Sequence, residues 1–216
     1  NSNVTTTSNM FRDCKKLKRI IGLDRINTSK ITSTSSMFVN STSLNDVTLN
    51  WDLSNVLTLS GMFQATGLSK IEGITFSEEP PSNYTDSNRR RDFTSFARGC
   101  PNLTSINIDL RGFCRHDEIF RESPNISHIK SFDFTYDIVD NTNFAWNTKF
   151  TNLTDLNITG TISVSIPNGF NNMPNLTTKC LTDIINALVD LSGSNSKTCY
   201  LGATNLAKLS PDVIAI

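Results

Sequence analysis

The sequence predicts a solenoid of the α/β-type or β-rich class, with one short parallel strand in each repeat and a helical cap at the C-terminus. The first observation that predicts it is a phrase that returns along the chain. Its clearest copies are SNMFRDCKKLKRI (8–20), SSMFVNSTSLNDV (35–47) and SGMFQATGLSKI (60–71), and looser copies are FARGCPNLTSI (96–106), IFRESPNISHI (119–129) and GFNNMPNLTTKC (169–180). A recurring phrase indicates a stack of similar coils, in which each coil is stabilised by its neighbours.

The second observation is the apolar register that closes each phrase. A leucine or isoleucine marks it, and the spacings between marks are 27, 24, 35, 23, 27 and 23 residues; the marks are Leu17, Leu44, Leu68, Leu103, Ile126, Leu153 and Leu176. After Leu44, Leu103 and Leu153 the residues follow the pattern L-x-x-L-x-L. Because alternation with period two indicates a strand with one face inward, each mark predicts a strand, and at this repeat length the pattern is the leucine-rich-repeat signature.

Aromatic residues lie ahead of each register mark. Met-Phe pairs stand at Met10-Phe11, Met37-Phe38 and Met62-Phe63, and later copies carry Phe96, Phe120, Phe150 and Phe170. We expect these residues to fill the core opposite the strands, where burial of each side chain contributes roughly 1.5–3 kcal/mol. The stripe is therefore interpreted as packing and not as a cofactor site.

The stretch WDLSNVLTLSGMF (51–63) resembles the BspA-like leucine-rich repeat, a bacterial surface protein repeat. The resemblance is close over residues 1–75 and continues more weakly to about residue 180, with residues 83–95 outside it. The tail 181–209 is similar to the end segment of such proteins in gut bacteria and their prophages. It implies an extracellular or virion-associated protein that binds macromolecules or glycans without catalysis. A bacterial adhesin and a phage tail receptor-binding component both fit.

The chain divides into a solenoid over residues 1–180, with about seven irregular repeats, and a capping segment over residues 181–216. The pattern predicts a helix whose apolar face carries Leu181, Ile184, Ile185, Leu188 and Leu191, ended by Gly193. A short strand is expected at 198–201, and Ser210-Pro211 is expected to begin another helix. The first residues already match the repeat, and the last residues stop inside a helix-like pattern. We therefore expect this chain to be a segment of a larger protein.

The outward positions of the strands are the candidate binding face, because stacked parallel strands bring them into line. One row is predicted at Arg19, Asp46, Lys70, Ser105, His128 and Asp155, and a second at Ile21, Thr48, Glu72, Asn107, Lys130 and Asn157. Such a mixed polar surface suits a polar ligand or a wet protein interface. A merely solvated sheet is the alternative.

A second candidate site is the insertion at 76–93, which lengthens the interval between Leu68 and Leu103. Pro80-Pro81 interrupt both helix and strand, so the segment is expected to project as a loop. Tyr84, Arg89, Arg90 and Arg91 would form its contact patch. A spacer without a binding role is the alternative.

The cysteines are interpreted as packing residues more than as reactive groups or metal ligands. Five occur, with neither a C-x-x-C pair nor Cys/His ligand spacing. Cys14 and Cys100 share a repeat position with Ser41 and Ser123, which predicts a small buried residue at a corner. A disulfide between Cys180 and Cys199 stays open.

Composition and sequence motifs argue against several classes of function. Lys+Arg and Asp+Glu are 20 each, which argues against nucleic-acid binding, and no apolar run predicts a membrane span. No motif of an enzyme, metal site or cofactor site is present, although spacing alone does not exclude a glycosidase pair of carboxylates. Asn-x-Ser/Thr recurs at equivalent repeat positions, which indicates asparagine at a tight turn. The prediction is a non-enzymatic recognition module that binds a protein or glycan, with a structural spacer as the alternative.

Overall fold

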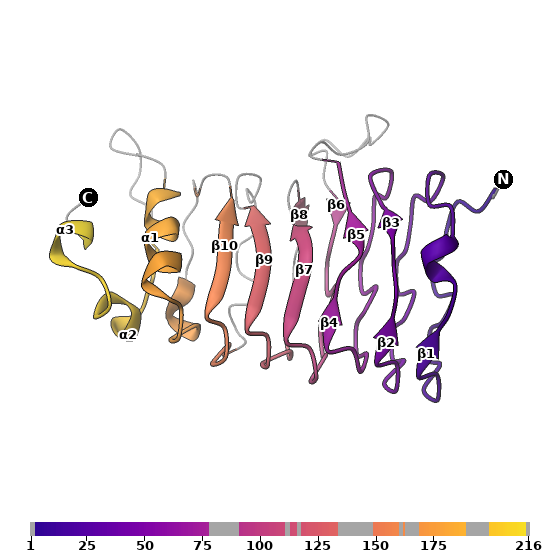
Figure 1. The fold of residues 1–216 in the computed structure, drawn as a ribbon, viewed down its shortest axis with the longest axis horizontal. Coiled ribbons are helices and arrows are strands. Elements are labelled where there is room, and N and C mark those ends of the chain that lie inside the picture. Colours follow the sequence, from indigo (N-terminus) through magenta and orange to yellow (C-terminus); the bar gives the residue numbers. More distant parts are fainter. Residues whose placement is uncertain are drawn as a thin grey trace.

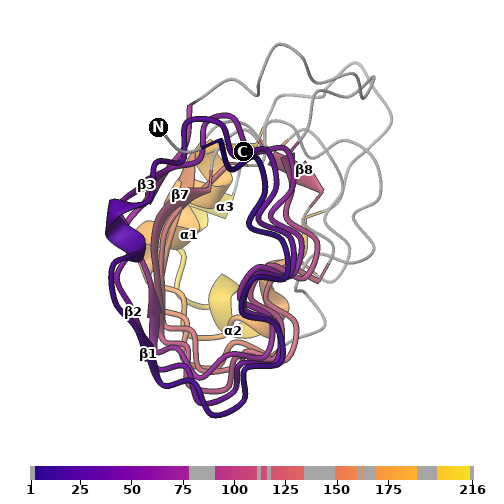
Figure 2. The same cartoon turned by 90° about the vertical axis from the view of Figure 1, so that its right-hand side faces the viewer.

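The computed structural model describes residues 3–77, 91–110, 113–115, 118–133, 149–159, 162, 169–188 and 199–214. These residues form a parallel-strand β-solenoid whose coils are stacked side by side from the N-terminus to a helical C-terminal end (Figure 1). The predicted fold class is confirmed. Seen along the stack, the coils superimpose around a common core (Figure 2).

One wall of the solenoid, the strand face, carries the strands that follow the register marks. They are β1 (Arg19–Ile20), β2 (Asp46–Val47), β4 (Lys70–Ile71), β7 (Ser105–Leu110), β9 (His128–Asp133) and β10 (Asp155–Thr159). β1 pairs with β2, and β4, β7, β9 and β10 form a four-stranded parallel sheet. Arg19 lies opposite Asp46, Lys70 opposite Ser105, and His128 opposite both Ser105 and Asp155. The predicted alignment of the first row is confirmed at these pairs.

Further short strands extend the coils beyond the strand face. β3 (Trp51–Asp52) pairs with β5 (Ile74–Thr75), and β6 (Arg91–Asp92) pairs with β8 (Phe113–Arg115), all in parallel. A 3-10 helix, η1 (Leu23–Arg25), takes the corresponding part of the first repeat, and the Trp51 indole N–H donates to Leu23 O at 2.6 Å. The sequence pattern did not predict these additional strands, because the strand prediction depended on the register marks and these strands do not directly follow a mark.

The opposite wall, the back wall, is held by a backbone ladder. Bridges align Thr6, Ser33, Thr58 and Asp92, and we name the coils that begin there coil 1 (6–32), coil 2 (33–57), coil 3 (58–91) and coil 4 (from 92). Each coil donates backbone N–H groups to the next; for coils 2 and 3 the donors are Thr34, Ser36, Phe38 and Asn40 and the acceptors are Thr58, Ser60, Met62 and Gln64. Coils 1 and 2, and coils 3 and 4, repeat the four bonds.

Two residues in each back-wall segment adopt the left-handed conformation. The first position is Asn9, Ser36, Gly61, Ser95 and Glu118, and the second is Asp13, Asn40, Ala65, Gly99 and Glu122, with φ between 54° and 68°. Non-glycine residues rarely adopt this conformation, and asparagine and aspartate tolerate it best. The repeated turns give the back wall the folded outline that Figure 2 shows.

Phenylalanine rings stack along the core between successive coils. Phe11, Phe38 and Phe63 are stacked nearly parallel, with centroids 5.7 and 5.4 Å apart, and Phe96 meets Phe63 edge to face at 5.2 Å. The predicted core role of the aromatics is confirmed at Phe38, Phe63, Phe96, Phe120, Phe150 and Phe170, which are fully buried. The prediction is wrong for Met10, which is 47% exposed. Met37 and Met62 are buried because they lie between two coils, whereas none of the described residues covers the outer side of coil 1.

The shared corner position is buried as predicted at Ser41, Cys100 and Ser123, and Cys14 of coil 1 is half-buried. The structure adds a hydrogen bond: Ser41 Oγ donates to Phe11 O at 2.6 Å, and Ser123 Oγ donates to Ala97 O at 2.7 Å. Cys100 Sγ lies 3.0 Å from Phe63 O. The position therefore needs a side chain that is small and also able to donate.

The C-terminal helix α1 (Thr178–Asn186) replaces the strand of the last repeat and packs against β10. Thr177 caps it by accepting the Cys180 N–H, and Cys180, Leu181 and Ile184 are buried. The helix ends at Asn186, earlier than predicted, because Leu188 leaves it to bridge with Ile162. Leu191 and Gly193 lie outside the described residues. The helix itself begins at Thr178, three residues ahead of the expected capping segment.

Two short helices, α2 (Ala203–Leu206) and α3 (Pro211–Ile214), complete the cap, and the predicted helix at Ser210-Pro211 is confirmed. At Cys199 the predicted strand is reduced to an isolated bridge. Asn205 is buried, and its amide donates to three carbonyls, those of Phe170, Met173 and Leu201, at 2.9–3.1 Å. The Lys208 ammonium donates to Pro174 O and Leu176 O. These bonds attach the cap to the last coil.

The left-handed conformation predicts that glycine-to-alanine in one coil and alanine-to-glycine in the neighbouring coil change the free energy of unfolding in opposite directions. Gly99→Ala should lower the free energy of unfolding by about 1 kcal/mol, because alanine is strained at φ 68°, while the added Cβ would lie 3.9 Å from Ala65 and meet no clash. Ala65→Gly should raise it by up to about 1 kcal/mol. Urea unfolding measures both. A loss of stability in both variants would contradict the conformational explanation.

Asn205→Ala should loosen the cap, because it removes the buried amide that donates to the carbonyls of Phe170, Met173 and Leu201, at a cost of about 1–3 kcal/mol. We expect amide hydrogen exchange of residues 199–214 to accelerate while that of β7 and β9 is unchanged. Asn186→Ala, on the exposed end of α1, is the matched control and should leave exchange of 199–214 as it was. Equal acceleration in both variants would argue against the anchoring role of Asn205.

Candidate binding face

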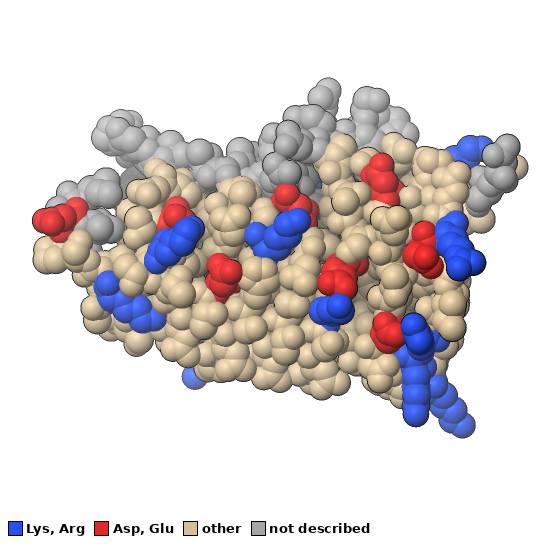
Figure 3. All heavy atoms as spheres, in the orientation of Figure 1, with Lys and Arg blue, Asp and Glu red and all other residues tan. Residues whose placement is uncertain are grey.

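The strand face brings the first-row candidates into register on paired strands, and the second-row candidates lie further along the same segments. Acidic and basic side chains are interspersed across it (Figure 3). The first-row candidates lie on consecutive strands at register positions, and Thr48, Glu72, Asn107, Lys130 and Asn157 each follow two residues later along the chain. The exposed candidates are Arg19, Asp46, Thr48, Lys70, Lys130, Asp155 and Asn157, and the half-buried ones are Glu72, Asn107 and His128.

Most charges of the strand face are paired within it. Arg19 Nε lies 2.9 Å from Asp46 Oδ2, and Lys70 Nζ lies 2.6 Å from Glu72 Oε1. His128 Nδ1 lies 2.9 Å from Asp155 Oδ2. Exposed pairs of this kind contribute at most about 1 kcal/mol each to stability, so their main effect is to neutralise the surface.

The Lys70–Glu72 pair is stabilised in its charged form. The hydrogen bond to Glu72 raises the pKa of Lys70, and the hydrogen bond from Lys70 lowers the pKa of Glu72. The Asn107 amide also donates to Glu72, at 3.4 Å, and lowers that pKa further. The pair therefore persists at neutral pH and withdraws both charges from other partners.

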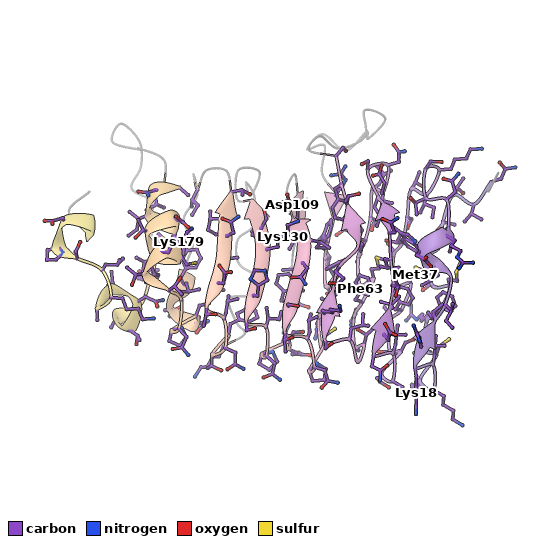
Figure 4. All side chains as sticks on the ribbon, in the orientation of Figure 1. Lys18, Met37, Phe63, Asp109, Lys130 and Lys179 are labelled. Atoms are coloured by element: carbon purple, nitrogen blue, oxygen red, sulfur yellow. The ribbon has the colours of Figure 1, made fainter. Side chains whose placement is uncertain are left out.

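Lys130 is the exception in the second row. It projects from β9 between the row positions of Asn107 on β7 and Asn157 on β10, and it is exposed (Figure 4). Among the residues that the structure describes, no carboxylate forms an ion pair with it. Lys130 is therefore the cation of this face that is available to an outside partner.

The second candidate site is corrected at Arg91. Arg91 was predicted to join an exposed contact patch with Tyr84, Arg89 and Arg90, but it is completely buried. Its guanidinium donates to Ser54 O at 3.0 Å, to Ser77 O at 3.0 Å and to Ser77 Oγ at 2.8 Å. Tyr84, Arg89 and Arg90 lie outside the described residues.

Arg91 contacts residues at the opposite end of the insertion. Its guanidinium carbon lies 5.5 Å from the centre of the Phe76 ring, and Phe76 in turn packs against the buried Phe93. Burial lowers the pKa of Arg91 to about 10, partly opposed by the charge of Asp52. Both ends of the expected insertion at 76–93 are thus part of the solenoid.

Cys180 and Cys199 are free thiols in the structure, as are Cys14 and Cys100. Burial raises the pKa of Cys180 and that of Cys199 to about 11, and it also raises the pKa of Cys100. A high pKa keeps a thiol protonated and unreactive at neutral pH. These three cysteines act as packing residues and not as nucleophiles.

Asparagines line a corner of the solenoid at equivalent positions. The Asn125 amide donates to Pro101 O at 2.7 Å, Asn175 donates to Thr151 O at 2.5 Å, and Asn152 donates to Asn125 Oδ1 at 3.2 Å. Each asparagine immediately precedes a register mark. The predicted role of this recurring asparagine in a tight turn is confirmed at these positions.

The described residues include no group of three or more His, Cys, Asp or Glu side chains placed to hold a metal ion. No helix in the described part of the chain has the length and apolar character needed to cross a membrane.

The fold and this face define a parallel β-solenoid with a polar, largely self-paired strand surface. Residues 1–75 match the model of the DUF285 family, described as a Mycoplasma protein of unknown function. The match ends at Thr75, the last residue of β5, and covers the three Met-Phe pairs. No curated protein and no solved structure matches the chain.

Arg91→Met should lower the free energy of unfolding by about 2–3 kcal/mol, because it keeps the apolar stem but removes the donors to Ser54 and Ser77. Urea unfolding of the whole chain measures the loss. Arg25→Met, at an exposed position, should change stability by less than about 0.5 kcal/mol. An unchanged free energy of unfolding in Arg91→Met would contradict the buried, hydrogen-bonded position of Arg91.

Proposed function

We propose that the chain is a non-enzymatic recognition module of a larger surface-exposed protein, and that it binds a protein or glycan through the strand face. The observation that carries the proposal is Lys130, an exposed cation in a row of amides on a rigid sheet. The amides of Asn107 and Asn157 add donors and acceptors on either side of it. Rigid strands hold such groups at fixed spacing, which favours binding because little conformational entropy is lost.

The chemistry of the face favours a polar partner. Among the described residues of the sheet β4–β7–β9–β10, the exposed side chains are polar or charged, and the large apolar ones are buried except for the half-buried Ile158. Hydrogen bonds and bridging water would therefore contribute more to binding than apolar burial. A charged or amide-rich polypeptide and a polyhydroxylated glycan both suit this surface.

The setting of the module is part of the same proposal. We infer a BspA-like leucine-rich-repeat protein located on a bacterial cell surface, where it acts as an adhesin, or on a phage tail, where it acts in receptor binding. The resemblance of residues 51–63 and the solenoid architecture support this setting. No cofactor, nucleic acid or membrane insertion belongs to the proposed role.

A structural spacer in a surface fibre or virion is the second candidate. The specific observation that favours it is the internal pairing of Arg19 with Asp46 and of Lys70 with Glu72. A face whose charges already neutralise one another has less to offer a charged partner. The two candidates differ in whether the isolated chain binds anything.

The test is binding of the whole chain to glycan arrays and to intact bacterial cells, compared with Lys130→Glu. We expect charge reversal to weaken binding about tenfold or more, because it replaces an attractive contact by a repulsive one. Stability should change by less than about 0.5 kcal/mol, since Lys130 is exposed.

Lys149→Glu is the matched control, because Lys149 is an exposed lysine outside the strands. It should bind as the unmodified chain does. Equal loss in both variants would indicate non-specific charge attraction, and normal binding by Lys130→Glu would exclude the second row. The absence of binding by the unmodified chain would favour the spacer.

A further inference from the structure

A row of side-chain amides is fixed along one edge of the solenoid, which we name the asparagine corner. Its members immediately precede the register marks of successive coils, and all four are exposed: Asn102, Asn125, Asn152 and Asn175. Each donates one amide N–H to the preceding coil, and Asn102 does so to Gly67 O at 3.4 Å. In Figure 1 the corner follows the lower edge of the solenoid, where the chain enters β7, β9 and β10.

The turn at this corner forms without asparagine as well. Lys16 and Ser43 occupy the same position in coils 1 and 2, where the N–H of the register mark donates to the carbonyl three residues earlier at 2.9 Å. The same bond measures 3.2 Å at Leu103 and 3.4 Å at Leu176. Asparagine therefore adds groups to the later coils that the backbone turn does not need.

The corner keeps hydrogen-bonding capacity for an outside partner. A primary amide has two N–H donors and an oxygen that accepts, so one bond to the preceding coil leaves further capacity on each asparagine. Two residues further along, Thr104, Ser127 and Thr154 donate their hydroxyl hydrogens to carbonyls of the preceding coil, at 3.0–3.3 Å. Their oxygens then remain as acceptors. The edge thus presents a row of amides beside a row of hydroxyl oxygens.

We propose that the asparagine corner binds an uncharged glycan chain that lies along the axis of the solenoid. Sugar hydroxyls both donate and accept hydrogen bonds, and so do the free parts of the amides. The amides take neighbouring hydroxyls of the glycan, while the oxygens of Thr104 and Thr154 accept from others. These residues differ from those of the strand-face site around Lys130, so the corner is a second binding site.

The composition of the corner favours a neutral glycan over other partners. The segments 101–104, 124–127, 151–154 and 174–177 contain no charged residue and no Trp or Tyr. An anionic polymer would meet no cation in them to replace its counterions. A protein partner would meet none of the Trp, Tyr and Arg side chains that dominate protein interfaces. At the C-terminal end of the row, the Lys208 ammonium is already engaged by the carbonyls of Pro174 and Leu176.

The spacing of the row suits a polymer. Parallel strands lie about 4.7–4.9 Å apart, so the four asparagines together extend over about 14 Å. Pro101 and Pro124, which precede two of them, are exposed, and their rings offer apolar surface to the C–H face of a sugar. Proline also fixes the backbone at these turns, so little conformational entropy is lost on binding.

The test is calorimetric titration of the whole chain with neutral linear oligosaccharides of glucose, galactose and mannose, in series of increasing length. We expect affinity to rise with length until the glycan spans the row, and then to level off. The double variant Asn125→Ala, Asn152→Ala should weaken binding about tenfold or more, because it removes two of the four amides. Thr104→Val with Thr154→Val keeps the amides and should weaken binding about threefold.

Asn55→Ala is the matched control. Asn55 is exposed and also donates an amide N–H to the preceding coil, to Ser29 O at 2.9 Å, but it lies between β3 and the back wall. It should bind the oligosaccharides as the unmodified chain does, and urea unfolding checks that every variant is folded. Equal loss in Asn55→Ala and in the corner variants would overturn the proposal.

Lys130→Glu separates the corner from the strand face. Neutral oligosaccharides should bind this variant as they bind the unmodified chain. Loss in Lys130→Glu with normal binding by both corner variants would assign the glycan to the strand face and overturn the second site alone. A preference for sulfated or phosphorylated oligosaccharides, or the absence of binding to any neutral one, would also overturn it.

Discussion

The parallel hydrogen-bond ladder between successive coils is the constraint on which the rest of the structure depends. It holds each coil at one register relative to the next, so equivalent residues lie above one another on every wall. The Phe11–Phe38–Phe63 stack, the donors at the buried corner and the asparagine corner are all consequences of that register. Because the ladder repeats, a residue type that suits one coil suits its neighbours, and the sequence becomes repetitive.

The same repetition explains how far the sequence predicts the structure. The register marks predicted the strands and the alignment of the first row, because a period-two apolar pattern has few alternative interpretations. The buried phenylalanines followed from their constant place ahead of each mark. Cys100 was placed correctly in the core because Ser41 and Ser123 occupy the same repeat position and share its burial.

Features that occur only once in the structure could not be predicted from the repeat pattern. Arg91 stands in a run of three arginines and resembles a solvated loop residue, yet its guanidinium satisfies the carbonyls of Ser54 and Ser77. Met10 matches Met37 in sequence but differs in burial, because burial depends on a neighbouring coil and not on the repeat itself. Asn205 has no repeat counterpart, and its role appears only once the last carbonyls that need donors are known.

The candidate binding groups are the polar side chains that have no partner within the described solenoid. On the strand face, pairing between and along the strands neutralises Arg19, Asp46, Lys70 and Glu72, so conspicuous charge is a poor guide to a site there. Lys130 is a better guide, because its charge has no counterpart on the described sheet. At the C-terminal end of the described stack, Asn205 and Lys208 donate to carbonyls of the last coil. A repeat protein of this kind therefore has few unpaired groups to offer a partner, and on the described part of the strand face Lys130 is such a group.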